Sequence, residues 1–421
     1  MVERRARERL ARRLIAALAL LACAAGAQEP GPGDTVADRP RPEVDGVEHR
    51  LRGFMLSTTV AVSREIDDNI YAERDNAVAD RADRLQPKLA LESSWNKHAL
   101  GLGGDATVVR YAEHPGEDHE NGSLWLDARL DVSDASRVTT ALRRDRDHEG
   151  RDSPDDADGD GRTPFVTESA RLSYSNRGSR FGFDLSAESR TLDFEDGVRA
   201  EDATSINNDD RDRRDARATA RLGLTLGPQY GVFLEASTGS LTYAQRFDDN
   251  GYARSSDGSE YAVGVALDRG VVFGDFFVGR RLQQFDDPRF STIDGPSFGG
   301  QLTWNVTRLT SLTALARRSV DPTTIVGVAG IDATLVELGA DHELRRNVVV
   351  SLRLRERTED FKGADRTDDI PGAAFTCRYL VNRRLHVIAG YTRERRSSTG
   401  AERSAFEYSR SLYLVQLQGH L

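Results

Sequence analysis

The chain has 421 residues, of which 30% are charged and 38% hydrophobic, and its formal net charge is −10. An acidic chain argues against nucleic acid as a partner. The mean hydropathy of −0.55 and the lack of a long apolar run after residue 27 exclude a membrane helix in the mature chain. They do not exclude a transmembrane barrel, because its strands alternate apolar and polar residues and average hydropathy hides them.

Residues 1–27 have the three parts of a secretory signal. A basic start with six arginines precedes a short apolar stretch at residues 14–22, and Ala25-Gly26-Ala27 fits the small-x-small cleavage pattern. Lipoprotein processing at Cys23, which follows Leu20-Leu21-Ala22, is the alternative. Cleavage after Ala27 leaves Cys377 as the one cysteine, so an intrachain disulfide is not expected.

Residues 28–53 follow the signal and carry no periodic pattern. Residues 28–49 are rich in proline, glycine and charge, a composition that cannot bury enough apolar surface to fold alone. We therefore predict a disordered periplasmic segment. A mobile plug that enters the barrel is the functional alternative.

Residues 54–421 repeat one theme, in which alternating segments of about ten residues are joined in turn by short turns and longer polar loops. At the start, Leu56 and Val62 alternate with Ser57 and Glu65, and at the end Tyr413, Val415 and Leu417 alternate with Gln416 and Gln418. Period two is the mark of a strand with one apolar face. We expect the apolar faces to meet lipid, with Phe375, Cys377 and Tyr379 among them.

The connections predict how many strands there are. Short turns lie near residues 96–97, 133–136, 176–178, 227–229, 269–270, 307–309, 346–347 and 382–383. Longer polar stretches lie near residues 67–81, 113–120, 147–162, 194–208, 247–257, 285–294, 321–328, 359–370 and 396–404. Together they predict an all-β, transmembrane antiparallel barrel of about 18 strands, with short periplasmic turns and long extracellular loops. The segments near 290–306 and 329–344 are the weakest, so 16 strands stays open.

The last strand runs to the end of the chain. Such a strand needs a partner on both edges, and in a closed barrel the partner across the seam is the first strand. An alternating last strand with an aliphatic C-terminal residue, Leu421, resembles the closing strand of bacterial outer-membrane barrels, whose usual last residue is Phe.

The stretch Arg64-Glu65-Ile66-Asp67-Asp68-Asn69-Ile70-Tyr71 resembles the start of the "Putative beta-barrel porin 2" family, whose first strand ends in Asp-Asp-Asn and an apolar residue. Pro87, Ser94-Trp95 and His98-Ala99-Leu100 fit the same pattern. The resemblance implies an outer-membrane barrel of a kind often linked with exopolysaccharide secretion. It also implies membrane lipid, lipopolysaccharide and periplasmic polysaccharide-export proteins as partners.

Several charged residues fall on the polar faces of the predicted strands and would line the lumen. They are Arg129, Arg171, Arg217, Arg221, Arg353, Arg355, Asp127 and Glu188, with Glu92 nearby. Mixed charges tune selectivity in barrel pores, and interior charges also pair to fill and stiffen a barrel. Both interpretations stay open.

The loop at residues 152–161 is the best metal candidate. Asp156, Asp158 and Asp160 alternate with small residues, and calcium prefers such hard oxygen ligands on a tight turn. The Glu that closes a twelve-residue calcium loop is missing, so a solvated acidic loop is the alternative. Asp67-Asp68-Asn69 offers a similar choice between a cation site and a loop entry. No other cofactor is predicted.

The eight histidines are scattered, and no Ser–His–acid or His–His–Glu grouping has a mechanistic spacing. We predict no enzyme; an outer-membrane lipase or protease is the rival class, and a soluble β-sandwich is the other. Barrels of 16–18 strands enclose an aqueous channel unless a segment plugs it. The sequence therefore predicts a passive conduit, for exopolysaccharide on the family resemblance, with a general or substrate-selective diffusion porin or a structural surface barrel as alternatives.

Overall fold

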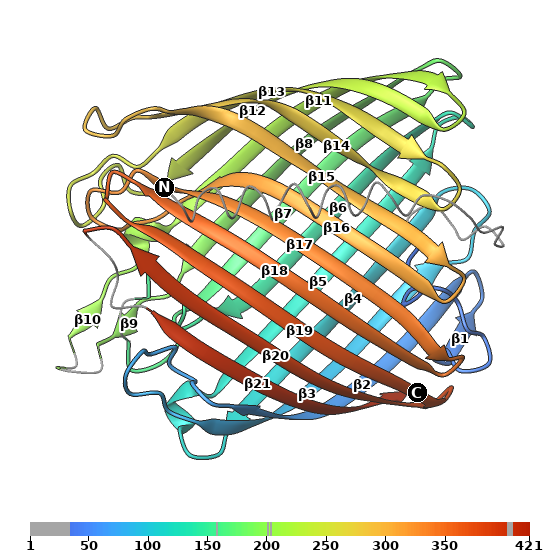
Figure 1. The fold of residues 1–421 in the computed structure, drawn as a ribbon, viewed down its shortest axis with the longest axis horizontal. Coiled ribbons are helices and arrows are strands. Elements are labelled where there is room, and N and C mark those ends of the chain that lie inside the picture. The colour runs from blue at the N-terminus through green and yellow to red at the C-terminus, as the bar shows by residue number, and fades with distance from the viewer. Residues whose placement is uncertain (1–33, 157–158, 200–201, 203, 402–406) are drawn as a thin grey trace, which may run out of the picture.

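The computed structural model describes residues 34–156, 159–199, 202, 204–401 and 407–421. Their strands form one closed antiparallel barrel (Figure 1). The barrel strands are β2 (Phe54–Asp67), β3 (Asp80–Ser93), β4 (Ala99–Tyr111), β5 (His119–Asp131), β6 (Ser136–His148), β7 (Pro164–Arg177), β8 (Phe181–Phe194), β11 (Arg213–Gly227), β12 (Tyr230–Tyr243), β13 (Ser256–Asp268), β14 (Val272–Phe285), β15 (Ile293–Thr307), β16 (Thr310–Asp321), β17 (Gly330–Arg345), β18 (Val348–Lys362), β19 (Thr367–Asn382), β20 (Leu385–Thr399) and β21 (Tyr408–His420).

Five small elements complete the described chain. Strand β1 (Glu48–Leu51) extends the barrel sheet, and β9 (Gly197–Val198) pairs with β10 (Ser205–Ile206) in the loop after β8. The 3-10 helices η1 (Pro115–Glu117) and η2 (Asp209–Arg211) lie in loops. No helix among the described residues is long and apolar enough to cross a membrane.

The prediction of 18 barrel strands is confirmed. The sheet has 19 strands, and one of them, the short β1, extends the sheet without being part of the barrel wall. Strands β15 and β17 occupy the two segments that left 16 strands open. All eight short turns lie at one end of the barrel and the longer loops at the other, with β9 and β10 at the loop end (Figure 1).

The seam closes as the sequence predicted, between the first and last barrel strands. Residues of β2 from Thr59 to Asp67 pair with β21 from His420 to Leu412. The first residues of β2 pair with β1 instead, where Leu51 lies opposite Phe54. Every edge of the barrel sheet along the seam therefore has a partner, which removes the open edge that would otherwise invite aggregation.

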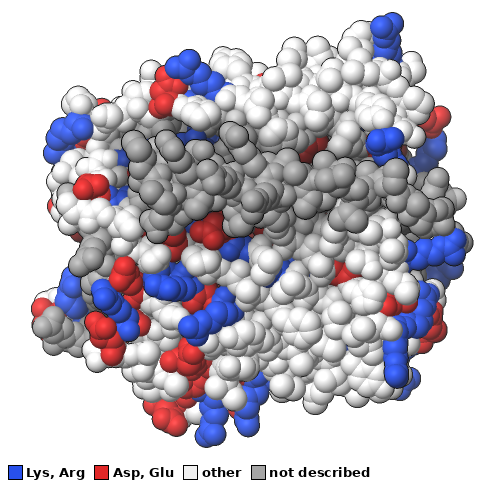
Figure 2. All heavy atoms as spheres, in the orientation of Figure 1, with Lys and Arg blue, Asp and Glu red and all other residues white. Residues whose placement is uncertain are grey.

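The alternation of faces is also confirmed. On β2, the outward Val62 is 53% exposed, whereas the inward Ser63 and Glu65 are 3% and 6% exposed. The outward residues Leu234 and Val415 are 60% and 59% exposed on other strands. Figure 2 shows charged side chains at both ends of the visible face, more of them toward the loop end, with largely uncharged surface between.

The disorder predicted for residues 28–53 does not hold for residues 34–53. Val36 is fully buried and Arg41 is 1% exposed, and residues 48–51 form β1. The segment has too few apolar residues to build a core of its own, but the barrel wall provides a surface on which it packs. The proposed signal, Cys23 and residues 28–33 lie outside the described residues.

Candidate functional site in the barrel lumen

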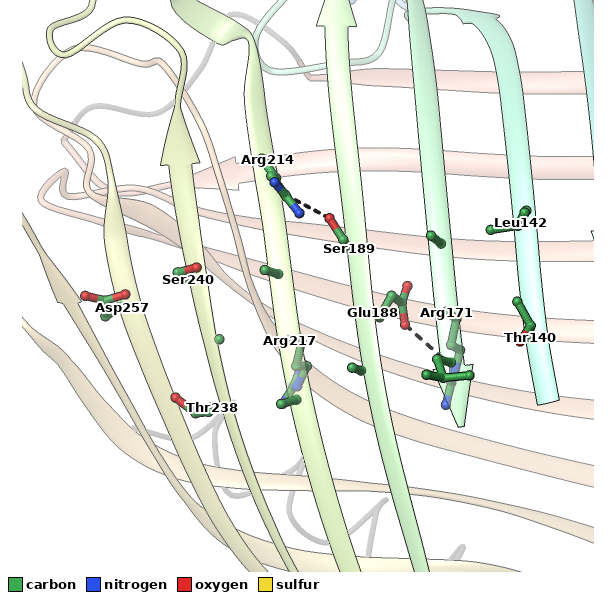
Figure 3. A pocket seen from close by; sticks show the side chains of 16 residues that line it. Thr140, Leu142, Arg171, Glu188, Ser189, Arg214, Arg217, Thr238, Ser240 and Asp257 are labelled. Carbon is green, nitrogen blue, oxygen red and sulfur yellow. Dashed lines mark hydrogen bonds and ion pairs between the residues drawn. The ribbon is translucent and has the colours of Figure 1, made fainter. Parts of the chain in front are cut away.

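All eight predicted lumen residues occupy inward positions of the register, because their strand neighbours are the outward apolar residues. Their arginines form ion pairs, all of them between strands except Arg129–Asp131, which lies along β5. The pairs are Arg129–Asp131 (3.1 Å), Arg171–Glu188 (3.7 Å), Arg217–Glu260 (2.7 Å), Arg221–Glu235 and Arg221–Asp275 (2.7 Å each), Arg353–Asp341 (2.9 Å) and Arg355–Glu394. Figure 3 shows the Arg171–Glu188 pair between β7 and β8.

The structure divides the predicted residues among three places. Asp127, Arg129 and Arg171 line one lumenal cavity of about 420 Å³, together with Glu92 and Trp125. Glu188 and Arg217 line a second cavity, of about 570 Å³, between β8 and β16. Arg221 on β11 and Arg353 and Arg355 on β18 lie apart from both cavities. Sequence reasoning missed the partners Glu260, Asp341 and Glu394, although each falls on the polar face of an alternating strand.

The described N-terminal segment, residues 34–47, covers the lumen face of β15 to β21 near the short turns. Its anchor is the ion pair Arg41–Glu343, 2.9 Å apart, with side chains 2% and 9% exposed. The backbone N–H of Val36 donates to Ser311 Oγ (2.7 Å), and the side chains of Arg378 and His386 bond the carbonyls of Ala37 (2.6 Å) and Val44 (2.9 Å). A desolvated, hydrogen-bonded ion pair of this kind is costly to break.

At the loop end, the segment between β6 and β7 folds against three other parts of the barrel. Arg151 and Arg162 donate to the buried Glu117 of η1 (2.5 and 2.9 Å). Arg396 of β20 donates to the carbonyl of Asp152 (2.7 Å). Asp155 accepts a bond from Thr323, in the β16–β17 loop (2.7 Å). We call its described residues, 149–156 and 159–163, the infolded loop.

Charge pairing rather than apolar packing holds the infolded loop. Burial opposes the charge on Arg151, but its hydrogen bonds and attraction to Glu117 outweigh burial and raise the pKa of the guanidinium. Glu149 accepts from Arg211 of η2 (2.6 Å) in the same way. The infolded loop therefore narrows the outer mouth of the lumen with fixed, paired charges.

The calcium prediction falls on this loop and stays untested. Asp156 pairs with Arg151 (3.4 Å), Asp160 is described through its backbone N–H, which donates to the Val198 carbonyl (2.8 Å), and Asp158 lies outside the described residues. In the described chain, no group of three or more His, Cys, Asp or Glu residues could hold a metal ion. Asp67 bonds the Asn69 N–H (2.9 Å), which is the loop-entry geometry of the Asp-Asp-Asn motif.

The outer wall over β6 to β13 carries a shallow groove of about 640 Å³. Its floor is made of small outward residues such as Ala187, Ala216 and Ala218, and near the loop end Arg214 donates to Ser189 (2.9 Å; Figure 3). These residues belong to the face that alternates with the lumen face, so the groove lies on the membrane side of the wall and not in the conduit.

A closed antiparallel barrel with an apolar outside, a charged inside, short turns at one end and long loops at the other is the architecture of an outer-membrane β-barrel. The family model described as "Putative beta-barrel porin 2" matches residues 41–419. The chain belongs to this family, as its sequence motifs indicated, and it is an outer-membrane barrel of porin-like type.

Solved structures with a similar fold are distant in sequence. OccK1 (OpdK) of Pseudomonas aeruginosa is 10% identical, with a TM-score of 0.43 over 87% of this chain and 99% of that chain. OccK3 (OpdO) of Pseudomonas aeruginosa is 14% identical, with a TM-score of 0.43 over 87% and 95%. The siderophore receptor PirA from Acinetobacter baumannii is 9% identical, with a TM-score of 0.42 over 86% and 80%. No curated protein matches the chain.

Proposed function

We propose that the protein is a passive outer-membrane conduit for hydrated polar solutes, and that its main cargo is an exported exopolysaccharide. The observation that carries the conduit is the lumen: arginines, carboxylates and hydroxyls line cavities of about 420 and 570 Å³ along the inner wall. Such a lining suits hydrated sugars and anions and suits lipid poorly.

The polysaccharide part of the proposal rests on the family resemblance. The sequence has no nucleotide or redox motif, so the proposal assigns the barrel no catalytic step, and the driving force comes from periplasmic partners. The outward ion pairs near the loops, such as Arg64–Asp83 (2.8 Å, both side chains more than half exposed), would face lipopolysaccharide headgroups.

A substrate-selective diffusion porin is the second candidate, and the narrowing at both ends favours it. Residues 34–47 cover one side of the inner mouth and the infolded loop narrows the outer mouth. Small solutes pass such restrictions more readily than a polymer does. A conduit for polymer would need residues 34–47 to leave the lumen during export.

Deleting the gene and measuring surface polysaccharide beside uptake of small polar solutes separates the two candidates. The export proposal predicts that surface polysaccharide falls while solute uptake stays normal. Unchanged polysaccharide with reduced uptake would replace export by the selective porin. If neither changed, the conduit itself would be wrong, and a structural role of the barrel would take its place.

A further inference from the structure

We propose that Trp125 is the platform of a saccharide-binding subsite inside the lumen, on the wall formed by β3 to β7. This inference rests on the proposed conduit and gives it a substrate class, pyranose sugars. It starts from one position: the indole is the only tryptophan side chain of the described residues that lies on an inward face, between Leu124 and Leu126, which face outward.

A glycine on the neighbouring strand fixes the ring. Trp125 on β5 lies directly opposite Gly103 on β4 in the register. A Cβ atom added at Gly103 would lie 2.3 Å from Cζ2 of the indole and 2.7 Å from Cε2. The ring therefore extends over the bare backbone of β4, which any other residue at position 103 would prevent. One face of the indole is held against the wall, and the half-buried side chain lines the adjoining cavity.

The cavity next to the ring holds uncommitted carboxylates. Glu92 and Asp127 line its volume of about 420 Å³ and are exposed to the lumen. Neither has an ion pair or a hydrogen bond within the described part of the chain, although ion pairs occupy most of the lumen charges. Arg129 and Arg171, each held by an acidic neighbour, line the same space and retain further N–H donors.

These groups match the two surfaces of a pyranose ring. The apolar C–H face of the sugar can lie on the indole, as apolar groups do on aromatic faces. The ring hydroxyls donate to carboxylates and accept from guanidinium groups, and hydrogen bonds with a charged partner are the stronger class. An acid beside an aromatic platform thus binds a sugar edge and face together, whereas an alkyl ligand would satisfy only the ring.

A second aromatic–glycine pair in the lumen has a packing role alone, because both faces of its ring are covered. Phe233 lies opposite Gly264, where an added Cβ would be 2.2 Å from its ring. Its other face is covered by the Arg221 guanidinium at 4.0 Å from the ring centroid, which Glu235 and Asp275 hold in place. Phe233 is 4% exposed. At Trp125 the Lys88 ammonium lies over the ring at a longer distance, 5.4 Å from the centroid, and the indole still lines the cavity of about 420 Å³.

Calorimetric titration of the full detergent-solubilised chain with maltohexaose, cellohexaose and hexagalacturonate tests the subsite without requiring transport. We expect at least one of the three to bind, and Trp125→Ala to weaken that binding by about tenfold or more. Trp125→Phe should recover part of the loss, and Asp127→Asn should weaken binding without a change in side-chain volume. Trp304→Phe, on the outward side of β15, is the matched control and should bind as the unchanged chain does.

Heat-shifted migration in detergent gels shows whether each variant retains a folded barrel. Failure of all three hexasaccharides to bind the folded chain overturns the inference, and so does equal binding by Trp125→Ala and the unchanged chain. Conductance of the same preparations in planar bilayers is read separately. If the barrel conducts ions but binds no sugar, the subsite is rejected and the conduit stands. If the barrel binds sugar but does not conduct, the conduit is rejected.

Discussion

Both sides of the short-turn mouth carry carboxylates, but those on one side are buried and paired and those on the other are exposed to the lumen. Beneath residues 34–47, on the side of β15 to β21, Asp341 is fully buried and Glu343 is 8% exposed, and both accept bonds from arginines. On the side of β3 to β7, Glu92 and Asp127 are open to the lumen. The difference comes from the covering segment, because a charge removed from water must be paired whereas a hydrated one need not be.

The two sides of the short-turn mouth therefore have different roles. The covered side anchors a segment of the chain, and the energetic cost of burying its charges makes that contact specific. The open side presents uncommitted polar groups beside an indole, which is what a passing solute requires. Mutations should therefore affect docking on one side and recognition on the other.

The largest effect is expected where the buried ion pair is broken. Arg41→Ala leaves Glu343 buried without its cation, which should cost the docking of residues 34–47 about 3–5 kcal/mol. The measurement is cleavage by a glutamate-specific protease at Glu43 and Glu48, which should become rapid. Arg346→Ala removes the exposed pair with Glu43 and should change cleavage little, since exposed pairs contribute about 0–1 kcal/mol. Equal cleavage of the two variants would show that the buried pair does not hold the segment.

The second largest effect is expected from substitutions on the two faces of one strand, β18. Leu352 on β18 faces outward and is 42% exposed, and the adjacent Arg353 faces the lumen. A charge on the lipid face near the middle of the membrane costs about 2–4 kcal/mol. Leu352→Arg should therefore lower the yield of heat-modifiable barrel more than Arg353→Leu. Equal yields would contradict the assigned register.

A smaller effect is expected at the outer mouth. Glu117→Gln keeps the shape of the side chain but removes the charge that holds Arg151 and Arg162, which should loosen the infolded loop by about 1–3 kcal/mol. Tryptic cleavage after Arg151 and Arg162 should increase. Chelation of calcium provides the comparison: cleavage that does not change with calcium would return Asp156, Asp158 and Asp160 to a solvated loop, and cleavage that rises on chelation would support the calcium site.

The barrel could be predicted from the sequence because residues close together in the chain determine the faces and the ends of each strand. Alternation at Val62 and Glu65 fixes the faces of a strand, and short turns such as residues 346–347 fix its ends, so neighbouring strands must pair. Even the closing pair of β2 and β21 follows from the need to cover both edges. Membership of the family was predicted from the residues around Asp67-Asp68-Asn69.

The contacts inside the barrel were not predictable in this way. Arg41 and Glu343 are separated by 302 positions, and Asp155 reaches Thr323 across a separation of 168, so composition alone made both segments look solvated. Trp125 lies on the polar face between Ser123 and Asp127, where alternation places it in the lumen. Its role depends on Gly103 across the strand pair, which requires the register.

Single-channel recording in planar bilayers tests the central claim, that the lumen is a polar conduit half covered by residues 34–47. The account predicts discrete current steps for the unchanged chain and larger steps for Arg41→Ala, which releases the segment from the inner mouth. Steps of the same size from both would separate the segment from the conduction path. Folded, heat-modifiable barrels that pass no current in either form would contradict the conduit.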